Sequence, residues 1–249
     1  MPGAQAEYLR IAMADASLFP MPGGIKKELG LMMCDILPTG YSVAMNAWRL
    51  ADEDRERGGG GGGLAGEGKG EGKKGICVVV GCGPVGLCAI TSAKTMFEKV
   101  FATDLAPHRL VAAEKHGAIA LPKAELLVAV SETTNGRGAD AVLELVGHEA
   151  ALLTAIELAR PYGVISVGGV HHAPLSLNGG TLYDKNLRFQ FGRCSVRSFF
   201  DPALQVLRAN QELFDGFVEH VVEWDQAEEY YALFERNKVG KTAFMAYGG

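Results

Sequence analysis

The sequence predicts an α/β fold, a doubly wound parallel sheet with helices on both faces. From residue 75 onward, short apolar runs alternate with helical patterns, which is the arrangement of successive βαβ units. The first of these runs, ICVVV at 76–80, is apolar throughout, as expected for a strand buried on both sides. A glycine-rich turn follows this run directly and leads into a helical pattern.

Length and composition indicate one sizeable core and exclude several classes of protein. The chain has 249 residues, of which 48% are apolar, and a formal net charge of −5. Without a basic stripe we expect no binding to nucleic acid. No apolar run is long enough to cross a membrane and no basic-then-apolar leader is evident, so we expect a cytoplasmic protein without membrane contact. Five scattered cysteines without a CxxC pair suggest reduced thiols.

The first part of the chain differs from the rest. Alternating apolar and polar residues at 3–16 predict a strand that leaves a turn. Residues 37–51 predict a helix of small and apolar side chains. Residues 52–74 hold a charge run and ten of the 33 glycines, and this composition predicts a flexible surface linker. A phosphate-binding loop fits this segment less well, because no strand precedes it and its glycines have no fixed spacing.

The alternating region then predicts each element in order. Strands are expected at 76–82, 99–104, 119–121, 139–147 and 163–169, with helices at 84–97, 107–118, 124–134 and 149–159 between them. A further strand is expected at 187–193, followed by helices at 201–213 and 225–238 and a closing strand at 241–247.

The turn after the first buried strand carries a dinucleotide-binding spacing. In GCGPVG, which includes Pro84 and Val85, the glycines Gly81, Gly83 and Gly86 match G-x-G-x-x-G. The first glycine permits the tight turn, the second lets a pyrophosphate approach the backbone, and the third allows close packing of helix and strand. The helix N-terminus supplies unpaired N–H groups for the phosphates. A glycine turn that binds another ligand, or none, is the alternative.

An acidic residue strengthens this interpretation. Asp104 ends the next predicted strand, 18 residues after Gly86, where an acid can bind the adenosine ribose hydroxyls. Leu105 and Ala106 follow it and offer no arginine for a 2′-phosphate, so NAD is predicted rather than NADP.

The sequence resembles a known family over nearly its whole length except residues 52–74. The segments GAQAEYLRI, DILPTGY, GCGPVGL, GADAVLELVG, GVISVGGVH, LYDKNLRFQFGRCSVRS and KVGKTAF occur in the order found in medium-chain, zinc-dependent alcohol dehydrogenases. They are most similar to the formaldehyde-dehydrogenase-like branch. The resemblance implies that residues 1–30 end a GroES-like catalytic domain, 31–192 form an NAD-binding Rossmann domain, and 193–249 return to the catalytic domain.

The resemblance also assigns a metal site of which this sequence carries one member. In the family, the first part of the catalytic domain supplies a Cys, a His and a nearby glutamate around zinc, and that part is absent here. Asp35 matches the third zinc ligand, and Thr39 matches the threonine that touches the nicotinamide ring. From the residues alone, Asp35 could instead be a capping acid at the start of the helix that follows.

Further cofactor contacts are implied by the resemblance. Val146 and Gly147 correspond to residues on the adenosine side of NAD. The VGGV segment, beginning with Val167 and Gly168, would place backbone groups near the nicotinamide carboxamide, as would Phe191. Lys241 corresponds to a basic residue that reaches the pyrophosphate, although a solvated surface lysine is equally consistent with the sequence.

The histidines add little to these expectations. His171 and His172 follow a predicted strand, and we expect loop positions with one side chain facing in and the other out. His108 and His116 fall in a helical pattern and are expected at its surface.

Two functions from different classes follow. The first is a zinc-type oxidoreductase that transfers a hydride between NAD and an alcohol or aldehyde. The second is an NAD(H)-binding module without catalysis, either a pseudoenzyme or a truncated chain, which the start at MPGAQAEY favours. A zinc-free quinone reductase relative is disfavoured by DILPTGY and FGRCSVRS. The resemblance further implies a homo-oligomer formed through the edge of the cofactor sheet, near residues 182–193.

Overall fold

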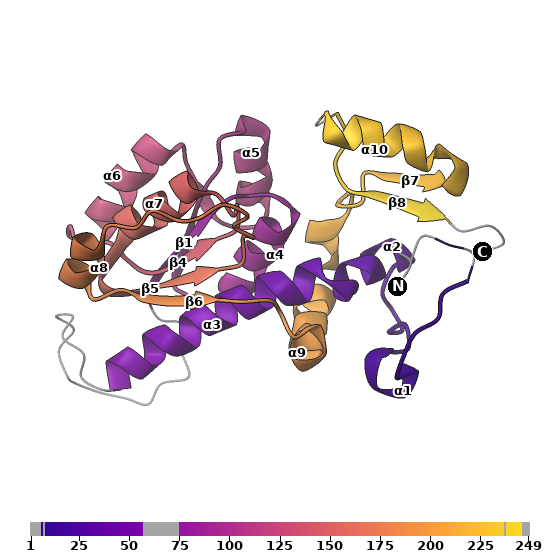
Figure 1. Ribbon diagram of the computed structural model, residues 1–249, viewed down its shortest axis with the longest axis horizontal. Helices are drawn as coiled ribbons and strands as arrows, with labels where there is room; N and C mark the ends of the chain where they lie inside the picture. The colour runs from indigo at the N-terminus through magenta and orange to yellow at the C-terminus, as the bar shows by residue number, and fades with distance from the viewer. Residues whose placement is uncertain (1–5, 7, 57–74, 237, 246–249) are drawn as a thin grey trace.

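The computed structural model describes residues 6, 8–56, 75–236 and 238–245. Its centre is a six-stranded parallel sheet in the order β3-β2-β1-β4-β5-β6 (Figure 1). The strands are β1 Ile76–Val80, β2 Lys99–Thr103, β3 Ile119–Ala120, β4 Ala139–Glu144, β5 Ala159–Val167 and β6 Arg188–Phe191. All six were predicted, and the α/β, doubly wound fold class is confirmed.

Helices connect the strands as the alternation predicts. They are α4 Pro84–Ala93, α5 Pro107–Lys115, α6 Lys123–Thr133, α7 Glu149–Leu158 and α8 Gly179–Lys185. Only α8 was not predicted. It is seven residues long and begins with two glycines, and glycine is a poor helix former. Asn178 caps this helix by accepting a hydrogen bond from the Thr181 N–H at 3.2 Å, which favours a helical start that the composition does not indicate.

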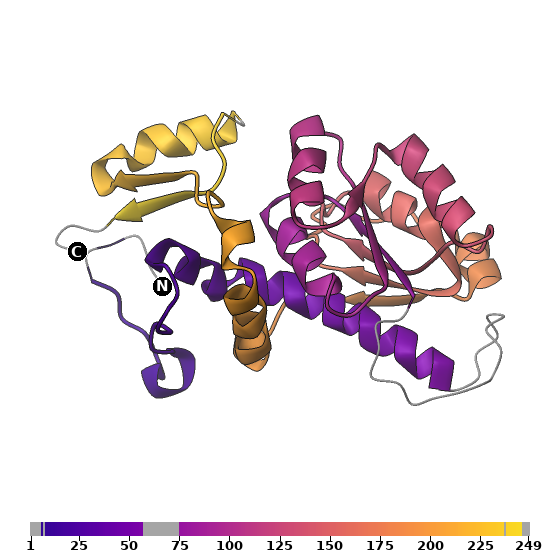
Figure 2. The same cartoon turned by 180° about the vertical axis from the view of Figure 1, so that it is seen from behind.

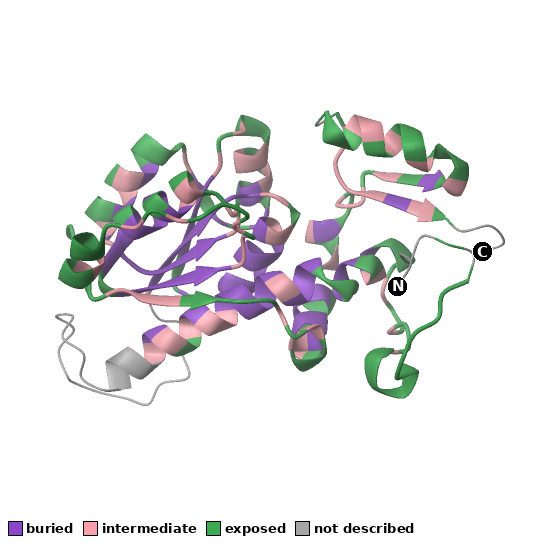
Figure 3. Cartoon of the chain, viewed as in Figure 1, coloured by how far each residue is buried: buried purple, intermediate pink, exposed green. Residues whose placement is uncertain are grey.

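Two apolar cores lie on opposite faces of the sheet (Figure 3). Successive residues of β1 alternate between them, because side chains along a strand point to opposite faces. Cys77 and Val79 belong to the core beneath α4, whereas Val78 and Val80 belong to the core that α6 and α7 cover. Every residue of β1 and β4 is buried, and burial on both faces explains why β1 is recognisable as a continuous apolar run.

The long helix α3, Ile36–Glu56, packs across the first core. A Cβ on Gly40 would lie 2.6 Å from the backbone nitrogen of Ala89, so glycine at this position lets α3 approach α4 closely. The helix continues past its expected end, and residues 52–56 are helical rather than part of a linker. The run DEDRE contains neither glycine nor proline, so nothing in it stops a helix. The rest of the predicted linker, 57–74, lies outside the described residues.

The expected strand over 3–16 is wrong for the residues of this stretch that the structure describes. Those residues form turns and a short helix, α1 Ala14–Ser17, before α2 Lys27–Gly30 and the 3-10 helix η1 Leu31–Cys34. A strand needs a neighbour to satisfy its backbone N–H and C=O groups, and no strand pairs with this stretch in the described part of the chain. Phe19 instead anchors it by stacking on Phe200, with the ring centroids 3.9 Å apart.

The last part of the chain leaves the sheet through α9 Val196–Ala209, which packs on the same core as α3. It then forms η2 Gln211–Phe214, β7 His220–Glu223, η3 Trp224–Gln226, α10 Ala227–Glu235 and β8 Thr242–Met245. Strands β7 and β8 pair in parallel, and this unit lies apart from the six-stranded sheet in both views (Figures 1 and 2). The strand β7 was not predicted. The domain boundaries at residues 30 and 192 stay predictions.

No helix among the described residues is long and apolar enough to cross a membrane.

Candidate functional site

The turn after β1 has the geometry that its glycine spacing predicts. Gly81 has a φ of +98°, and its N–H donates to the Thr103 carbonyl at 2.9 Å. A Cβ on Gly86 would lie 2.0 Å from the Gly81 carbonyl oxygen, so only glycine allows α4 to begin this close to the turn. A Cβ on Gly83 would meet no atom within 4 Å. The backbone at Gly83 is therefore open to a ligand, as a pyrophosphate-binding turn requires.

The first backbone N–H donors of α4 lie at this turn. Gly83 is extended and Pro84 is the first helical residue, a position that proline favours because its missing N–H would have had no partner in the helix. The first N–H groups of a helix have no intrahelical acceptor. Here Val85 and Gly86 carry them, next to the open backbone of Gly83. An anion placed at this turn would meet these donors and the positive end of the helix.

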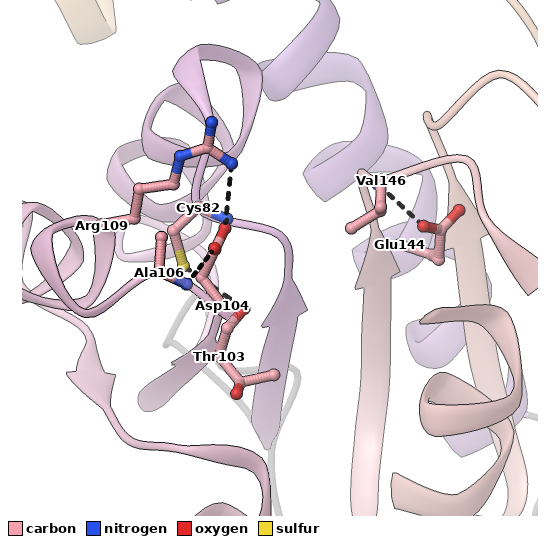
Figure 4. A network of polar contacts seen from close by, with 7 residues as sticks. All are labelled: Cys82, Thr103, Asp104, Ala106, Arg109, Glu144 and Val146. Carbon is pink, nitrogen blue, oxygen red and sulfur yellow. Dashed lines mark hydrogen bonds and ion pairs between the residues drawn. The ribbon is translucent and has the colours of Figure 1, made fainter. Parts of the chain in front are cut away.

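Asp104 lies directly after β2 and braces the glycine turn (Figure 4). One carboxylate oxygen accepts from the Cys82 N–H at 2.8 Å, and the other accepts from the Ala106 N–H at 2.9 Å. The side chain is only 8% exposed. An ionised carboxylate has about four acceptor positions, so these two bonds leave room for hydroxyl donors. The sequence predicted a ribose contact for Asp104 but not its bond to the turn.

Arg109, one turn into α5, lies beside Asp104. Its Nη1 atom is 3.6 Å from an Asp104 oxygen, and its side chain is 43% exposed. The preference for NAD was predicted because Leu105 and Ala106 offer no guanidinium. The structure supplies one from a later residue, which the sequence reasoning did not consider. The preference for NAD over NADP therefore stays a prediction.

Three strand ends meet at the same edge of the sheet as the glycine turn. Val146 and Gly147 follow β4, Gly168 follows Val167 at the end of β5, and Phe191 ends β6. The carboxyl ends of parallel strands share one edge, and ligands bind there where the strand order reverses. In this sheet the reversal lies between β1 and β4. A Cβ on Gly81 would lie 2.7 Å from Cγ2 of Val146, so the glycine turn and the β4 turn are in contact across it.

Glu144 is the functional candidate that sequence reasoning missed at this edge. It ends β4 with a side chain that is 0% exposed. One of its oxygens accepts from the N–H groups of Val146 and Gly147, both at 2.8 Å, and the other lies 3.0 Å from Nε2 of His171 (Figure 4 shows the bond to Val146). The available signal was an acid at the carboxyl end of a strand whose preceding three residues are apolar.

Lys241 precedes β8, far from the glycine turn in sequence. Burial raises the pKa of Cys88 in α4, and the positive charge of Lys241 opposes that rise. The lysine is therefore close enough to α4 for its charge to be felt within that helix. This position is compatible with the predicted approach to a pyrophosphate, which stays a prediction.

Asp35 and Thr39 contact each other at the start of α3. The Thr39 hydroxyl donates to Asp35 Oδ1 at 2.9 Å, and the Thr39 N–H donates to the Asp35 carbonyl at the same distance. Cys194, in the loop after β6, lies beside them. Burial raises the pKa of this thiol, while contacts with Ser42 and Thr39 lower it by less. The Asp35 carboxylate thus accepts from a side-chain hydroxyl one turn into α3, and the capping alternative, in which it would accept from backbone N–H groups, stays a prediction.

The donors of this region do not make a complete metal site. Among the residues that the structure describes, no group of three or more His, Cys, Asp and Glu side chains is arranged to hold a metal ion. Catalytic zinc takes three protein ligands, and Asp35 with Cys194 would supply two. A resident zinc ion therefore does not fit the donors described, and the assignment of Asp35 as a ligand stays a prediction.

The histidines separate into structural and site positions. His171 faces inward onto Glu144 and His172 is exposed, as predicted for the pair. His108 is exposed, but the surface position expected for His116 is wrong. The residue follows the last turn of α5, and its Nδ1 lies 2.8 Å from the Thr91 hydroxyl in the core. Burial lowers the pKa of His116 to about 4, so the ring is neutral near pH 7 and packs as an apolar group.

Comparison of the chain with known proteins finds related dehydrogenases. A family model described as zinc-binding dehydrogenase matches residues 84–209. The chain is 40% identical to zinc-type alcohol dehydrogenase B of Aspergillus flavus, over 98% of this chain and 54% of that protein. It is 31% identical to a probable zinc-binding alcohol dehydrogenase of Mycobacterium tuberculosis, over 92% of this chain and 54% of that protein.

A solved structure agrees with the sequence relatives. Alcohol dehydrogenase TADH from Thermus sp. ATN1 superposes with a TM-score of 0.82 and 30% identity, over 98% of this chain and 66% of that one. The chain thus spans about half the length of the two curated relatives named above. Since the family match covers half of the sequence and includes the helix that leaves the glycine turn, this chain belongs to the zinc-binding dehydrogenase family.

Proposed function

We propose that this chain forms the NAD(H)-binding part of a zinc-type alcohol dehydrogenase-like oxidoreductase. One observation carries the proposal: at the glycine turn, Gly83 is open and Gly86 is closed. A Cβ would be free at the first position and would collide with backbone at the second. A turn that served packing alone would not need an uncovered backbone beside the first N–H groups of a helix. A pyrophosphate needs both the open backbone and the donors.

The remaining cofactor would lie along the carboxyl edge of the sheet. Asp104 would accept the adenosine ribose hydroxyls with the acceptor positions that the turn leaves free, and Lys241 would balance the pyrophosphate charge. The turn after β4 would lie on the adenosine side and the loop after β5 would flank the nicotinamide half, with Thr39 near the ring. NAD, when bound there, accepts a hydride from a substrate carbon. The protein residues bind and orient it and limit the access of water.

The substrate class we propose is a small alcohol or the matching aldehyde. The alcohol dehydrogenases among the relatives support it, as does the resemblance to the formaldehyde-dehydrogenase-like branch. Homo-oligomer formation through β6, the edge strand of the sheet, belongs to the same proposal.

A second candidate is an NAD(H)-binding module without catalysis. The observation that favours it is the incomplete donor set around Asp35, whose carboxylate already accepts from Thr39. Metal analysis of the purified 249-residue chain separates the two candidates. We expect much less than one zinc ion per chain, and a tightly held zinc at one per chain would overturn the second candidate.

Titration of the chain with NADH, followed by the fluorescence of the bound nicotinamide, tests the cofactor site. We expect saturable binding with a Kd below about 1 mM, the weak end of specific affinities. Competition by ADP-ribose, which lacks the nicotinamide, locates the adenosine half. A parallel titration with NADPH tests the preference for NAD, with Arg109 as the residue that could accept a 2′-phosphate. Absence of saturation by either cofactor would overturn both candidates.

A further inference from the structure

Glu144 connects two loops that are separate in sequence. Its carboxylate accepts from the N–H groups of Val146 and Gly147 in the turn after β4. Its backbone carbonyl accepts from the N–H groups of Gly168 and Gly169 in the loop after β5, at 2.8 and 3.1 Å. One residue at the end of β4 thus binds the backbone of both loops.

The two loops also touch without intervening side chains. A Cβ on Gly147 would lie 2.5 Å from the Val170 carbonyl oxygen, and a Cβ on Gly169 would lie 2.1 Å from the Gly147 nitrogen. Gly147 has a φ of +77°, which side chains rarely adopt. The loops therefore approach as closely as backbones allow, and a small shift of one would displace the other.

His171, the fourth residue of the loop after β5, completes this connection. Its Nε2 lies 3.0 Å from the Glu144 oxygen that does not bind the β4 turn, and its side chain is 9% exposed. A carboxylate only accepts, so with Glu144 ionised the Nε2 atom of His171 carries the proton and donates. The ring also meets Phe191 at the end of β6 edge to face, with centroids 6.2 Å apart.

Each of the two loops also carries an apolar side chain that is exposed to solvent. Val146 is 52% exposed and Val170 is 64% exposed, although both are apolar. Three strand ends are thus linked by the contacts of Glu144, His171 and Phe191, while the apolar side chains of Val146 and Val170 stay exposed. A flat, partly apolar ring is a ligand that such a surface can take.

We propose that the Glu144–His171 pair is a positioning device that holds the β5 loop, the proposed seat of the nicotinamide half of NAD(H), at a fixed spacing from the β4 turn. The proposal rests on the proposed function, because it needs the cofactor at this edge. Neither side chain needs to contact the reacting atoms. The pair acts through the backbone of residues 146–147 and 168–170, which Glu144 and the loop contacts hold.

The first test uses NADH and ADP-ribose titrations of the full chain and its variants. His171→Ala leaves a buried Glu144 oxygen without its donor. We expect the Kd for NADH to rise about tenfold or more, in line with the loss of a hydrogen bond to a charged group. The Kd for ADP-ribose, which binds at the glycine turn, should rise less than about threefold. Such a rise corresponds to less than half the free energy of one hydrogen bond of this kind.

Three further variants separate positioning from folding. His171→Gln places an amide nitrogen near the former Nε2 and should restore binding of NADH to within about threefold of wild type. His172→Ala, which removes the exposed neighbouring ring, is the matched control and should change neither titration. Glu144→Gln keeps an oxygen acceptor for the β4 turn. The double variant Glu144→Gln/His171→Ala should raise the Kd for NADH by less than the product of the two single-variant increases.

Amide hydrogen exchange of the cofactor-free chain gives a readout that does not need binding. His171→Ala should accelerate exchange at Val146 and Gly147 and leave the amides of α4 unchanged. If His171→Ala loses equal affinity for NADH and ADP-ribose, or loses none for NADH, the positioning role is overturned while the cofactor site stands. If the wild-type chain fails to bind NADH, the proposed function and this proposal are both overturned.

Discussion

Gly83 and Gly86, the second and third glycines of the motif after β1, permit a sharp test of the site. Gly86→Ala places a Cβ 2.0 Å from the Gly81 carbonyl oxygen, about 1.4 Å short of ordinary contact. The obstacle is backbone, so α4 and the turn must separate. Overpacking of this kind costs about 1–3 kcal/mol. For a chain of this length, at about 2–4 °C per kcal/mol, that lowers the Tm by about 2–12 °C.

Gly83→Ala is the matched change three residues earlier. It adds the same methyl group where no atom lies within 4 Å and where φ is −71°, a value any residue adopts. We expect its Tm within about 2 °C of wild type, as for a substitution without a packing conflict. The methyl group would meet the pyrophosphate, so the Kd for NADH should rise at least about tenfold.

Thermal unfolding followed by circular dichroism and NADH titration give both quantities for each variant. The reasoning predicts a crossed result, in which stability falls for Gly86→Ala and affinity falls for Gly83→Ala with stability kept. An equal loss of Tm in the two variants would refute the geometry assigned to the turn. Unchanged NADH binding by Gly83→Ala would refute its approach to the pyrophosphate.

Three more predictions follow from buried or charged groups. Arg160→Leu removes the partner of buried Asp140, whose oxygen lies 2.8 Å from the arginine Nε. Urea unfolding should show that the free energy of unfolding falls by about 3–5 kcal/mol. A fall below about 1 kcal/mol would contradict a buried pair. Burial lowers the pKa of His116 to about 4 from 6.5, so the unfolded chain binds more protons between these values and the free energy of unfolding should fall as pH drops from 6.5 to 4. His116→Asn, which keeps a hydrogen-bonding partner for the Thr91 hydroxyl, should weaken this pH dependence, and an identical pH profile would count against it. Lys241→Gln should weaken NADH binding about three- to tenfold at low salt, the scale of one charge-assisted contact; a full loss that persists in high salt would indicate another role.

The sequence predicted most of the fold because its signals are local. Continuous apolar runs such as 76–80, together with the helical patterns between them, specify buried parallel strands wherever they occur. The two errors about strands have one physical origin. The alternation at 3–16 required a partner strand that the described chain does not supply, and β7 exists because β8 pairs with it. Whether a segment becomes a strand depends on a neighbour that the segment does not encode.

The candidate site divides in the same way. Gly81, Gly83, Gly86 and Asp104 could be found from spacing alone, since a turn and the ends of adjacent strands fix their positions. The bond of Asp104 to the turn, the approach of Arg109, and the joining of Glu144 to His171 across 27 residues could not. These contacts depend on which loops lie side by side and which atoms they present.

The sequence by itself thus determined the sheet, its order of alternation and the glycine turn after β1, because backbone conformation and burial period are local properties. Only the tertiary structure decided that Asp35 contacts Thr39 without two further metal donors among the described residues, and that two loops share one buried carboxylate. Metal sites and positioning pairs are assembled from distant residues. Their completeness is therefore a property of packing in three dimensions.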